Sequence, residues 1–305
     1  NDLTKLVLNC LLSLKFGFKF NNLQNMKQIP DSELIINSDG SIFHLHLHPN
    51  QLADDIIMVG DQSRVAMISK HFEHVEHKVQ NREFVTHTGF YKGKRITALS
   101  TGIGTDNIDI VVNELDALVN IDLNTRTEKI EKKSLNFVRI GTSGGLQRFL
   151  SAGDFLVSDS AIGFDGLLHF YEGSERVRRC DFEKALIAHL SYKSELPQPY
   201  VTDADKSLVE RLGDGFFHGV TISAPGFYGP QGRVLRLPIV NPDINNMISE
   251  FSFGNEKITN YEMESSAIFG LGNMLGHKSA TVCLIIANRY NKTALTDYKP
   301  KMEEL

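Results

Sequence analysis

The stretch NYEMESSA (residues 260–267) marks the point where a strand is expected to turn into a helix. Small Ser and Ala residues follow the carboxylates, as is typical of a helix that packs closely against a sheet. Glu262 and Glu264 are separated only by Met263, so two carboxylates and an apolar face share one short turn. Such a group suits a ribose diol, because each carboxylate can accept hydrogen bonds from neighbouring hydroxyls. The same pattern also suits an ordinary acidic helix start, where the helix dipole favours Glu.

Apolar, β-branched runs recur outward from this stretch, each followed by a glycine or a polar turn. They are residues 56–59, 96–100, 137–140, 155–158, 219–223 and 280–287. Patterns of helical period occupy residues 64–73, 108–119, 181–189, 204–212 and 264–275. Strands that alternate with helices predict an α/β fold with a mostly parallel or mixed sheet. The polar residues 122–136 are expected to form a solvated surface excursion.

Composition excludes several classes of protein. The 305 residues are 41% hydrophobic and carry a formal net charge of -5, without the clustered Lys and Arg of a nucleic-acid surface. The three cysteines, Cys10, Cys180 and Cys283, are widely spaced and form neither a disulfide framework nor a CxxC metal pair. We therefore expect a protein of the reducing cytoplasm, without nucleic-acid or membrane partners.

The first thirty residues differ from the rest. Residues 5–20 are apolar with interspersed lysines, but no small-residue cleavage site follows, and the apolar run is too short to span a bilayer. We expect residues 1–30 to be an N-terminal extension outside the fold and residues 31–305 to form a single domain. Deleting residues 1–25 should then leave activity and melting temperature unchanged.

Three glycine turns follow predicted strands, and two of them carry an arginine. They are VGDQSR (59–64), STGIGT (100–105) and RIGTSGG (139–145). Backbone N–H groups at a strand end together with Arg64 or Arg139 would make a cradle for a small anion. None has the GxxxxGK[ST] spacing of a nucleoside triphosphate loop. Each turn, taken alone, is equally consistent with a plain strand–helix connection and a solvated Arg.

The segment GFYGPQGR (226–233) offers groups that match a flat heterocycle. Gln231 presents a donor and an acceptor, Arg233 presents forked donors, and Phe227 offers a stacking face. This set fits the imide edge of uracil or thymine. A glycine-rich surface loop with a solvated Arg remains the alternative.

Taken together and in order, these motifs resemble those of the uridine phosphorylases in the hexameric (type I) nucleoside phosphorylase superfamily. GDQSR resembles the family's GDPxR motif, and NREF (81–84) resembles its HREF motif. The family's later motifs are resembled, in order, by the two later glycine turns, by FYGPQGR and by YEMES. The resemblance runs from about Ile42 to the end of the sequence. It implies a three-layer α/β/α fold with a central mixed β-sheet and a reaction in which phosphate cleaves uridine to uracil and ribose 1-phosphate.

The resemblance also implies roles for individual residues. Phosphate would be bound by Gly60, Arg64, Arg139, Thr142 and, from a neighbouring subunit, Arg82. Ribose would be bound by Glu262, Met263, Glu264 and, across a dimer interface, His44. The base would be bound by Phe227, Gln231 and Arg233. Arg139, Gln231 and Arg233 would act in catalysis by positioning phosphate and stabilising charge on the leaving base.

No cofactor is implied besides phosphate as co-substrate. Glu83 resembles a family residue that helps to hold a monovalent cation such as K⁺ between subunits, but Asn107 stands where relatives often have Ser. GDQSR has Gln62 in place of the usual Pro. The chain also stops where relatives continue a final helix, so a C-terminal truncation is expected.

The residue after the last core strand bears on base choice. Purine-cleaving relatives carry an Asp there to protonate the departing base, and this chain has Asn288. We therefore predict pyrimidine over purine nucleosides. The alternatives are a nucleosidase or a purine nucleoside phosphorylase of the same superfamily, and a nucleoside-binding protein without turnover.

Two histidine patterns compete with this interpretation. His44, His46 and His48 would share one face of a strand, as some zinc ligands do, although His48-Pro49 is expected to end such a strand. His71, His74 and His77 follow helical spacing and are expected on a solvated helix face.

Overall fold

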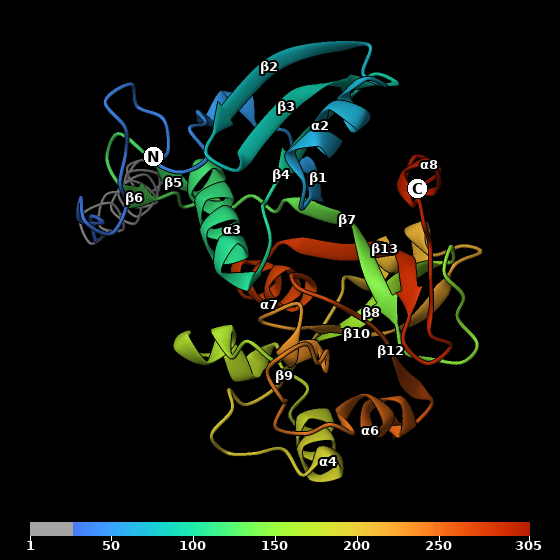
Figure 1. Cartoon of the computed structure of the whole chain (residues 1–305). Coiled ribbons are helices and arrows are strands. Elements are labelled where there is room, and N and C mark those ends of the chain that lie inside the picture. The colour runs from blue at the N-terminus through green and yellow to red at the C-terminus, as the bar shows by residue number, and fades with distance from the viewer. Residues whose placement is uncertain (1–26) are drawn as a thin grey trace, which may run out of the picture.

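Twelve strands form one large mixed sheet in the computed structural model, which describes residues 27–305 (Figure 1). Most of the predicted N-terminal extension, residues 1–26, lies outside the described residues. The path of the sheet runs β11-β12-β10-β8-β13-β7-β1-β4-β3-β2, and β9 and β14 pair with β8 and β13. The strands are β1 (Asp55–Val59), β2 (His74–Asn81), β3 (Phe84–Tyr91), β4 (Lys94–Ser100), β7 (Asn136–Gly145), β8 (Phe155–Gly163), β9 (Tyr200–Asp203), β10 (Phe217–Ser223), β11 (Ser252–Phe253), β12 (Glu256–Glu262), β13 (Lys278–Asn288) and β14 (Thr293–Ala294).

The sheet curls back on itself at β7. This strand pairs in parallel with β1 and β13, and its end also pairs antiparallel with β12, where Asn260 lies opposite Gly145. The end of β12, residues 262–264, therefore runs back along β7 toward its middle. A mixed sheet was predicted and is confirmed, and the closing β7–β12 pairing is a feature that the strand pattern did not reveal.

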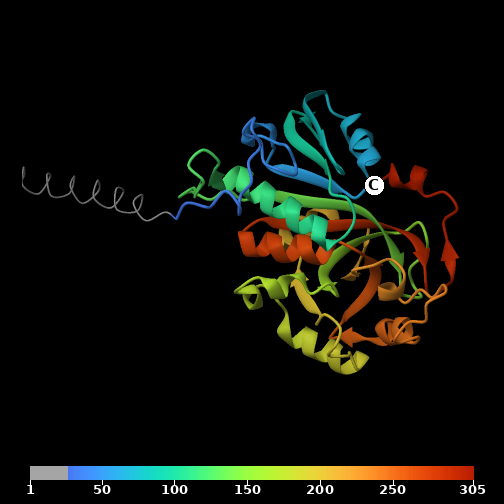
Figure 2. The ribbon, with the colours of Figure 1, turned by 60° about the vertical axis from the view of Figure 1, so that its left-hand side comes forward.

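Helices cover the sheet and complete the predicted α/β architecture. They are α2 (Gln62–Ser69), α3 (Thr105–Asn120), α4 (Cys180–Leu190), α5 (Lys206–Leu212), α6 (Ile244–Glu250), α7 (Ser265–Leu275) and α8 (Lys299–Met302). α3 and α7 lie side by side in both ribbon views (Figure 2). α3 buries Ile108, Val111, Leu115 and Leu118, a spacing that places them on one helical face. No helix within residues 27–305 is long and apolar enough to cross a membrane.

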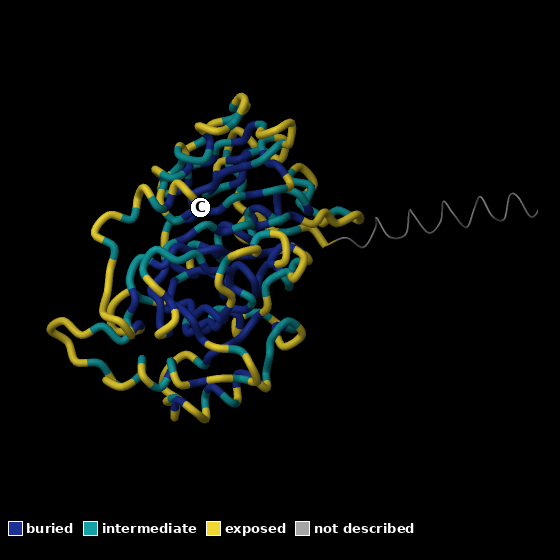
Figure 3. Tube along the Cα trace, turned by 90° about the vertical axis from the view of Figure 1, so that its right-hand side faces the viewer, coloured by how far each residue is buried: buried dark blue, intermediate teal, exposed yellow. Residues whose placement is uncertain are grey.

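The core lies between these helices and the sheet, where the buried residues concentrate (Figure 3). α7 is buried all round over Ser265–Gly272, which explains the small residues noted in the sequence. Gly270 is required there because a methyl group at this position would lie 2.4 Å from a side-chain carbon of Leu168. Close packing of α7 fixes the segment that precedes it, residues 262–264.

Two local expectations were wrong. Residues 139–145 do not form a turn, because hydrogen bonding to β13 and β12 continues strand β7 as far as Gly145. His74 and His77 do not lie on a helix but on strand β2, which pairs with β3.

The alternating histidines near residue 46 do not lie on a strand either. The backbone turns there, with His46 at a positive φ of 55°. His44 contacts Glu114, whereas His46 contacts Asp39, so the two imidazoles do not converge.

The predicted surface excursion 122–136 carries a small hairpin of β5 (Ile121–Asp122) and β6 (Thr127–Glu128).

Candidate active site

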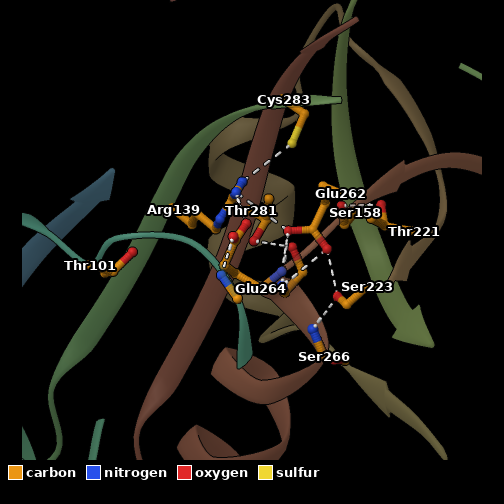
Figure 4. A network of polar contacts seen from close by, with 12 residues as sticks. Thr101, Arg139, Ser158, Thr221, Ser223, Glu262, Glu264, Ser266, Thr281 and Cys283 are labelled. Carbon is orange, nitrogen blue, oxygen red and sulfur yellow. Dashed lines mark hydrogen bonds and ion pairs between the residues drawn. The ribbon is translucent and has the colours of Figure 1, made fainter. Parts of the chain in front are cut away.

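Arg139 lies buried beside the two carboxylates of the NYEMESSA stretch (Figure 4). Its guanidinium donates a hydrogen bond to Glu264 and lies 3.5 Å from a Glu262 oxygen. Arg139 is only 6% exposed, Glu262 4% and Glu264 3%. Because β12 runs antiparallel to β7, its end approaches the middle of β7 and brings these side chains together.

Gly141 makes room for the Arg139 side chain. Strand alternation places both residues on the same face of β7, and the guanidinium folds back over Gly141. A methyl group on Gly141 would lie 1.8 Å from Arg139 Nη1, which no packed structure allows. Gly141, which the sequence pattern placed in a turn, therefore leaves the space that the Arg139 side chain occupies.

Glu262 is occupied in holding the start of α7. One oxygen accepts a hydrogen bond from the Glu264 backbone N–H at 2.9 Å, and the two oxygens lie 3.1 and 3.0 Å from the Ser265 N–H. The Ser223 hydroxyl at the end of β10 donates to the same carboxylate at 2.5 Å. These contacts satisfy helix N–H groups that have no partner within the helix.

Glu264 reaches the turn after β4. Its other oxygen accepts the Gly104 N–H at 2.8 Å. Gly102 in the same turn lies against Gly60, where an added methyl group would be 3.3 Å from the Gly102 carbonyl oxygen. The ends of β1, β4 and β12 therefore meet at Arg139 and Glu264.

The electrostatics of this cluster follow from burial. Burial raises the pKa of Glu264, and the attraction of Arg139 offsets only part of that rise. Burial lowers the pKa of Arg139, but Glu264 and Glu262 outweigh it, so its pKa lies above the ordinary value. Burial also raises the pKa of the neighbouring Cys283 thiol to about 12, so this cysteine is protonated at neutral pH.

A second cluster centres on Gln231, in the short helix η4 (Gly229–Gln231). Its side-chain oxygen accepts hydrogen bonds from Arg233 at 2.6 Å and Arg289 at 3.0 Å. Arg289 also donates to the Gln231 backbone oxygen at 2.7 Å. Both lone pairs of the amide oxygen are thus occupied, which fixes the amide orientation and leaves its NH₂ group as a donor.

The two guanidiniums of this cluster repel one another. Burial and the charge of Arg289 together lower the pKa of Arg233 to about 10. Burial also lowers the pKa of Arg289. Two cations held close together in a partly buried pocket favour a partner that is anionic or gains negative charge.

Several predicted site residues lie apart from these clusters. Arg64 lines a cavity of about 350 Å³ together with residues 302–305, and neither Arg139 nor Glu264 lines this cavity. Thr142 lies on the opposite face of β7 from Arg139. Phe227 was expected to stack on the base, but the Arg233 guanidinium lies over its ring, 3.7 Å from the ring centre. Met263 is half-buried between the two carboxylates.

The residues predicted to serve a neighbouring subunit lie outward from the cluster. Arg82 is exposed at the tip between β2 and β3, with Gln62 donating to its backbone oxygen at 2.7 Å. The His44 ring nitrogen Nδ1 lies 2.7 Å from Glu114 on α3. The Glu83 and Asn107 side chains both lie close to Gly102. Each has an oxygen atom that could coordinate a cation such as K⁺.

Asn288 is held in a structural role. Its side-chain NH₂ donates to the backbone oxygens of Gln147 and Leu150 at 2.9 and 2.7 Å, and its oxygen accepts the Asn291 N–H. An amide engaged in this way has no acid proton to give to a departing base.

Comparison with known proteins places this geometry in a family. A model of the Phosphorylase superfamily matches residues 54–304. The chain belongs to the phosphorylase superfamily. The superfamily prediction made from the motifs is thereby confirmed.

Individual members of the superfamily are similar along most of their length. The uridine phosphorylase of Thermococcus kodakarensis is 28% identical over 257 residues, which cover 82% of this chain and 79% of its own. The uridine phosphorylase of Haemophilus influenzae is 30% identical, covering 81% and 86%. A solved structure of Trypanosoma brucei nucleoside phosphorylase, described as showing uridine phosphorylase activity, superposes with a TM-score of 0.80 at 28% identity and covers 89% of this chain and 96% of its own.

Three polar residues of this phosphorylase were not singled out from the sequence. Arg289 follows β13 directly, and an arginine at the end of a core strand could have been found by the criterion applied to Arg139. Ser223 at the end of β10 and Glu114 in the middle of α3 carried no recognisable signal, because their partners lie 39 and 70 residues away in sequence.

Proposed function

We propose that this phosphorylase cleaves uridine with inorganic phosphate and releases uracil and ribose 1-phosphate. The observation that carries the proposal is the Arg139–Glu264 pair, which joins an arginine of the phosphate motifs to a carboxylate of the ribose motif. A phosphate on Arg139 and a ribose diol on Glu264 would then be neighbours. Uridine phosphorylases among the relatives support this choice of reaction.

In the proposed reaction, phosphate and the sugar are held close together while one bond replaces another. A phosphate oxygen bonds to C1′ as the bond from C1′ to the base nitrogen breaks, and the electron pair leaves with uracil. Positive charge on the sugar is stabilised by the phosphate dianion, and negative charge on uracil by the donors of Gln231 and Arg233. Uracil then takes a proton from solvent, so no acid–base pair is required.

The charge of the buried cluster argues for additional arginines at the phosphate. Arg139 carries one positive charge, whereas Glu262 and Glu264 together carry two negative charges when ionised. A phosphate dianion therefore needs further cations, and Arg64 with the neighbouring subunit's Arg82 would supply them. Water as the nucleophile would need no such cradle, which favours a phosphorylase over a nucleosidase.

A second copy of the chain is part of the proposal. Glu114, which holds His44, lies ten residues after Gly104, so it is about 15 Å along α3 from the residue that contacts Glu264. A ribose cannot bridge that span, so His44 would serve another subunit. Ile103 precedes α3, and Phe170 precedes Tyr171, which hydrogen-bonds Asp109 of α3; they are 66% and 88% exposed and offer apolar surface near this helix.

We further propose that the reaction takes place in a reducing cytoplasm and needs no cofactor. Cys180 and Cys283 form no disulfide within residues 27–305. Glu83 and Asn107 offer too few oxygens to hold K⁺ alone, so such a site would form only where a second copy contributes the same pair. No step of the reaction depends on it.

The product identifies the reaction. Purified protein supplied with uridine and phosphate should produce a ribose 1-phosphate signal in ³¹P nuclear magnetic resonance. Free ribose without that signal would instead establish a nucleosidase. A rise in melting temperature with uridine, but no product of either kind, would establish a binding protein.

A further inference from the structure

Cys283 is a buried group that the proposed reaction does not use. It lies on β13 opposite Gly141 of β7 in the parallel pairing of these strands. Paired residues share one face of a sheet, and Gly141 shares its face with Arg139, so the cysteine faces the arginine. Its sulfur accepts a hydrogen bond from Arg139 Nη1, with 3.7 Å between the two atoms (Figure 4). The thiol is therefore in direct contact with the guanidinium.

The two terminal nitrogens of Arg139 have different partners. Nη2 donates to Glu264 and lies 3.5 Å from a Glu262 oxygen. Nη1 lies between Gly141 and Cys283, and among residues 27–305 its hydrogen-bond acceptor is the Cys283 sulfur. Each of these nitrogens carries two hydrogens. Nη2 is thus directed at negative charge, whereas Nη1 meets one uncharged acceptor and has a second hydrogen to offer.

The chemistry of the thiol suits this position. Burial raises the pKa of Cys283 to about 12, so the group is an uncharged thiol at neutral pH. A thiol sulfur is a weak acceptor, and it does not cancel the charge of the arginine as a third carboxylate would. A charge-assisted hydrogen bond to a phosphate oxygen is roughly twice as strong as a neutral one. Phosphate can therefore bind at Nη1 without displacing a carboxylate.

We propose that Cys283 is a positioning residue for phosphate: its sulfur fixes the direction of Arg139 Nη1, so that the second hydrogen of this nitrogen points at a phosphate oxygen. The inference rests on the proposed function and deepens it, because it assigns phosphate to the Nη1 side of the guanidinium. Glu264 remains bonded to Nη2 and free of competition with phosphate for the same nitrogen.

The test measures the dissociation constant of inorganic phosphate by isothermal titration calorimetry in the wild type and in variants of Cys283. Cys283→Ser keeps a small acceptor and should stay within about twofold of the wild type, whereas Cys283→Ala, without an acceptor, should bind phosphate about three- to tenfold more weakly. Cys283→Val fills the space without an acceptor and should lose as much as Cys283→Ala. Wild-type affinity in either the alanine or the valine variant would overturn the proposal.

Two controls separate this effect from general damage. Val282 is buried on the opposite face of β13, where it packs with Leu208, so Val282→Ala should lower the melting temperature but leave phosphate affinity unchanged. Cys180 lies at the start of α4, outside the Arg139 cluster, and Cys180→Ala should change neither. Equal loss of phosphate affinity in Val282→Ala and Cys283→Ala would reduce Cys283 to a structural role and overturn the proposal.

Kinetics provide a second readout. KM for phosphate should rise in Cys283→Ala and Cys283→Val and recover in Cys283→Ser, with KM for uridine little changed because Glu264 keeps its bond to Nη2. Equal rises in both KM values would contradict the proposal. If the wild type cleaved no nucleoside, the proposed function would fail, and the phosphate affinities would still decide the role of Cys283. A wild type that bound no phosphate would overturn that role directly.

Discussion

At the scale of single residues, the site depends on Arg139 being held against carboxylates in a buried position. The arginine is 6% exposed, and its guanidinium crosses the Cα of Gly141 to reach Glu264. An arginine in that position has lost its hydration, so phosphate would meet donors that are already desolvated and oriented. The orientation depends on a glycine that itself would touch neither substrate.

Gly141→Ala tests this dependence. The new methyl group would overlap Arg139 Nη1, so the guanidinium must move away from Glu264. Losing one charged hydrogen bond predicts a rise in KM for phosphate of about 10- to 100-fold. Gly144→Ala on the same strand is the control, since its nearest atom would be 3.7 Å away. A normal KM for phosphate in Gly141→Ala would contradict the assigned role of Arg139.

Arg233→Ala tests stabilisation of the leaving base. Removing a donor that meets developing charge should lower kcat by about 10²–10³. Arg236→Ala is a suitable comparison, because this exposed arginine lies in the same loop outside the Gln231 cluster and should retain the wild-type kcat. A near-normal Arg233→Ala enzyme would remove Arg233 from the mechanism.

At the scale of elements, the junction of β12 and α7 connects fold to site. Glu262 accepts N–H groups from the start of α7, and Ser223 joins the same carboxylate to β10. Although the resemblance implies a ribose contact for Glu262, its oxygens are already used within the fold. Glu264 is then placed by the helix start that Glu262 secures.

Glu262→Ala should consequently destabilise the protein. Two backbone N–H groups and the Ser223 hydroxyl would lose a buried acceptor, which should cost about 2 kcal/mol or more of unfolding free energy. Urea unfolding measures this loss. Glu250→Ala at the exposed end of α6 should change stability by less than about 0.5 kcal/mol. Equal stability of both variants would show that the cap is not needed.

Some strands and helices could be predicted from the sequence pattern alone. The strand patterns at 56–59 and 96–100 and the helical pattern at 108–119 coincide with β1, β4 and α3, because apolar periodicity reflects burial on one face. Residues 139–145 were mistaken for a turn because glycine propensity was given more weight than strand pairing. The alternation of Val75, His77 and Val79 would have indicated strand β2, had it been preferred over helical spacing.

For the candidate site, motifs predicted the participants better than their arrangement. Gln231, Arg233, Arg139 and Glu264 lie in two polar clusters, as local motifs suggested. The position of Arg289 against Gln231 could not be predicted, because it depends on contacts between segments 58 residues apart. The individual binding roles stay predictions that the kinetic experiments test.

At the scale of the whole molecule, the domain and its assembly remain proposals. Within residues 27–305, the Ile29 N–H donates to the Arg126 backbone oxygen at 2.8 Å. We propose that the folded domain begins near residue 30. Deletion of residues 1–25 should therefore leave the melting temperature and the activity unchanged, and a large loss of either would show that this segment belongs to the fold.

Shared active sites can be tested by complementation. Glu264→Ala and His44→Ala variants should each be impaired alone, since each lacks one contact to the ribose. Co-expressed with different tags and purified through both, they should form mixed assemblies, and in each mixed dimer one of the two sites would have both residues intact. Recovery of activity above that of either variant would establish sharing. Unchanged low activity in mixed assemblies would confine each site to one chain.

The most direct test of the central claim is the initial rate of uracil release from uridine at increasing phosphate concentration, with inosine as a parallel substrate. We predict that uracil release requires phosphate and saturates with it, and that inosine is cleaved much more slowly because Asn288 offers no acid proton. Uracil release that is independent of phosphate, or equal rates with inosine and uridine, would contradict the account.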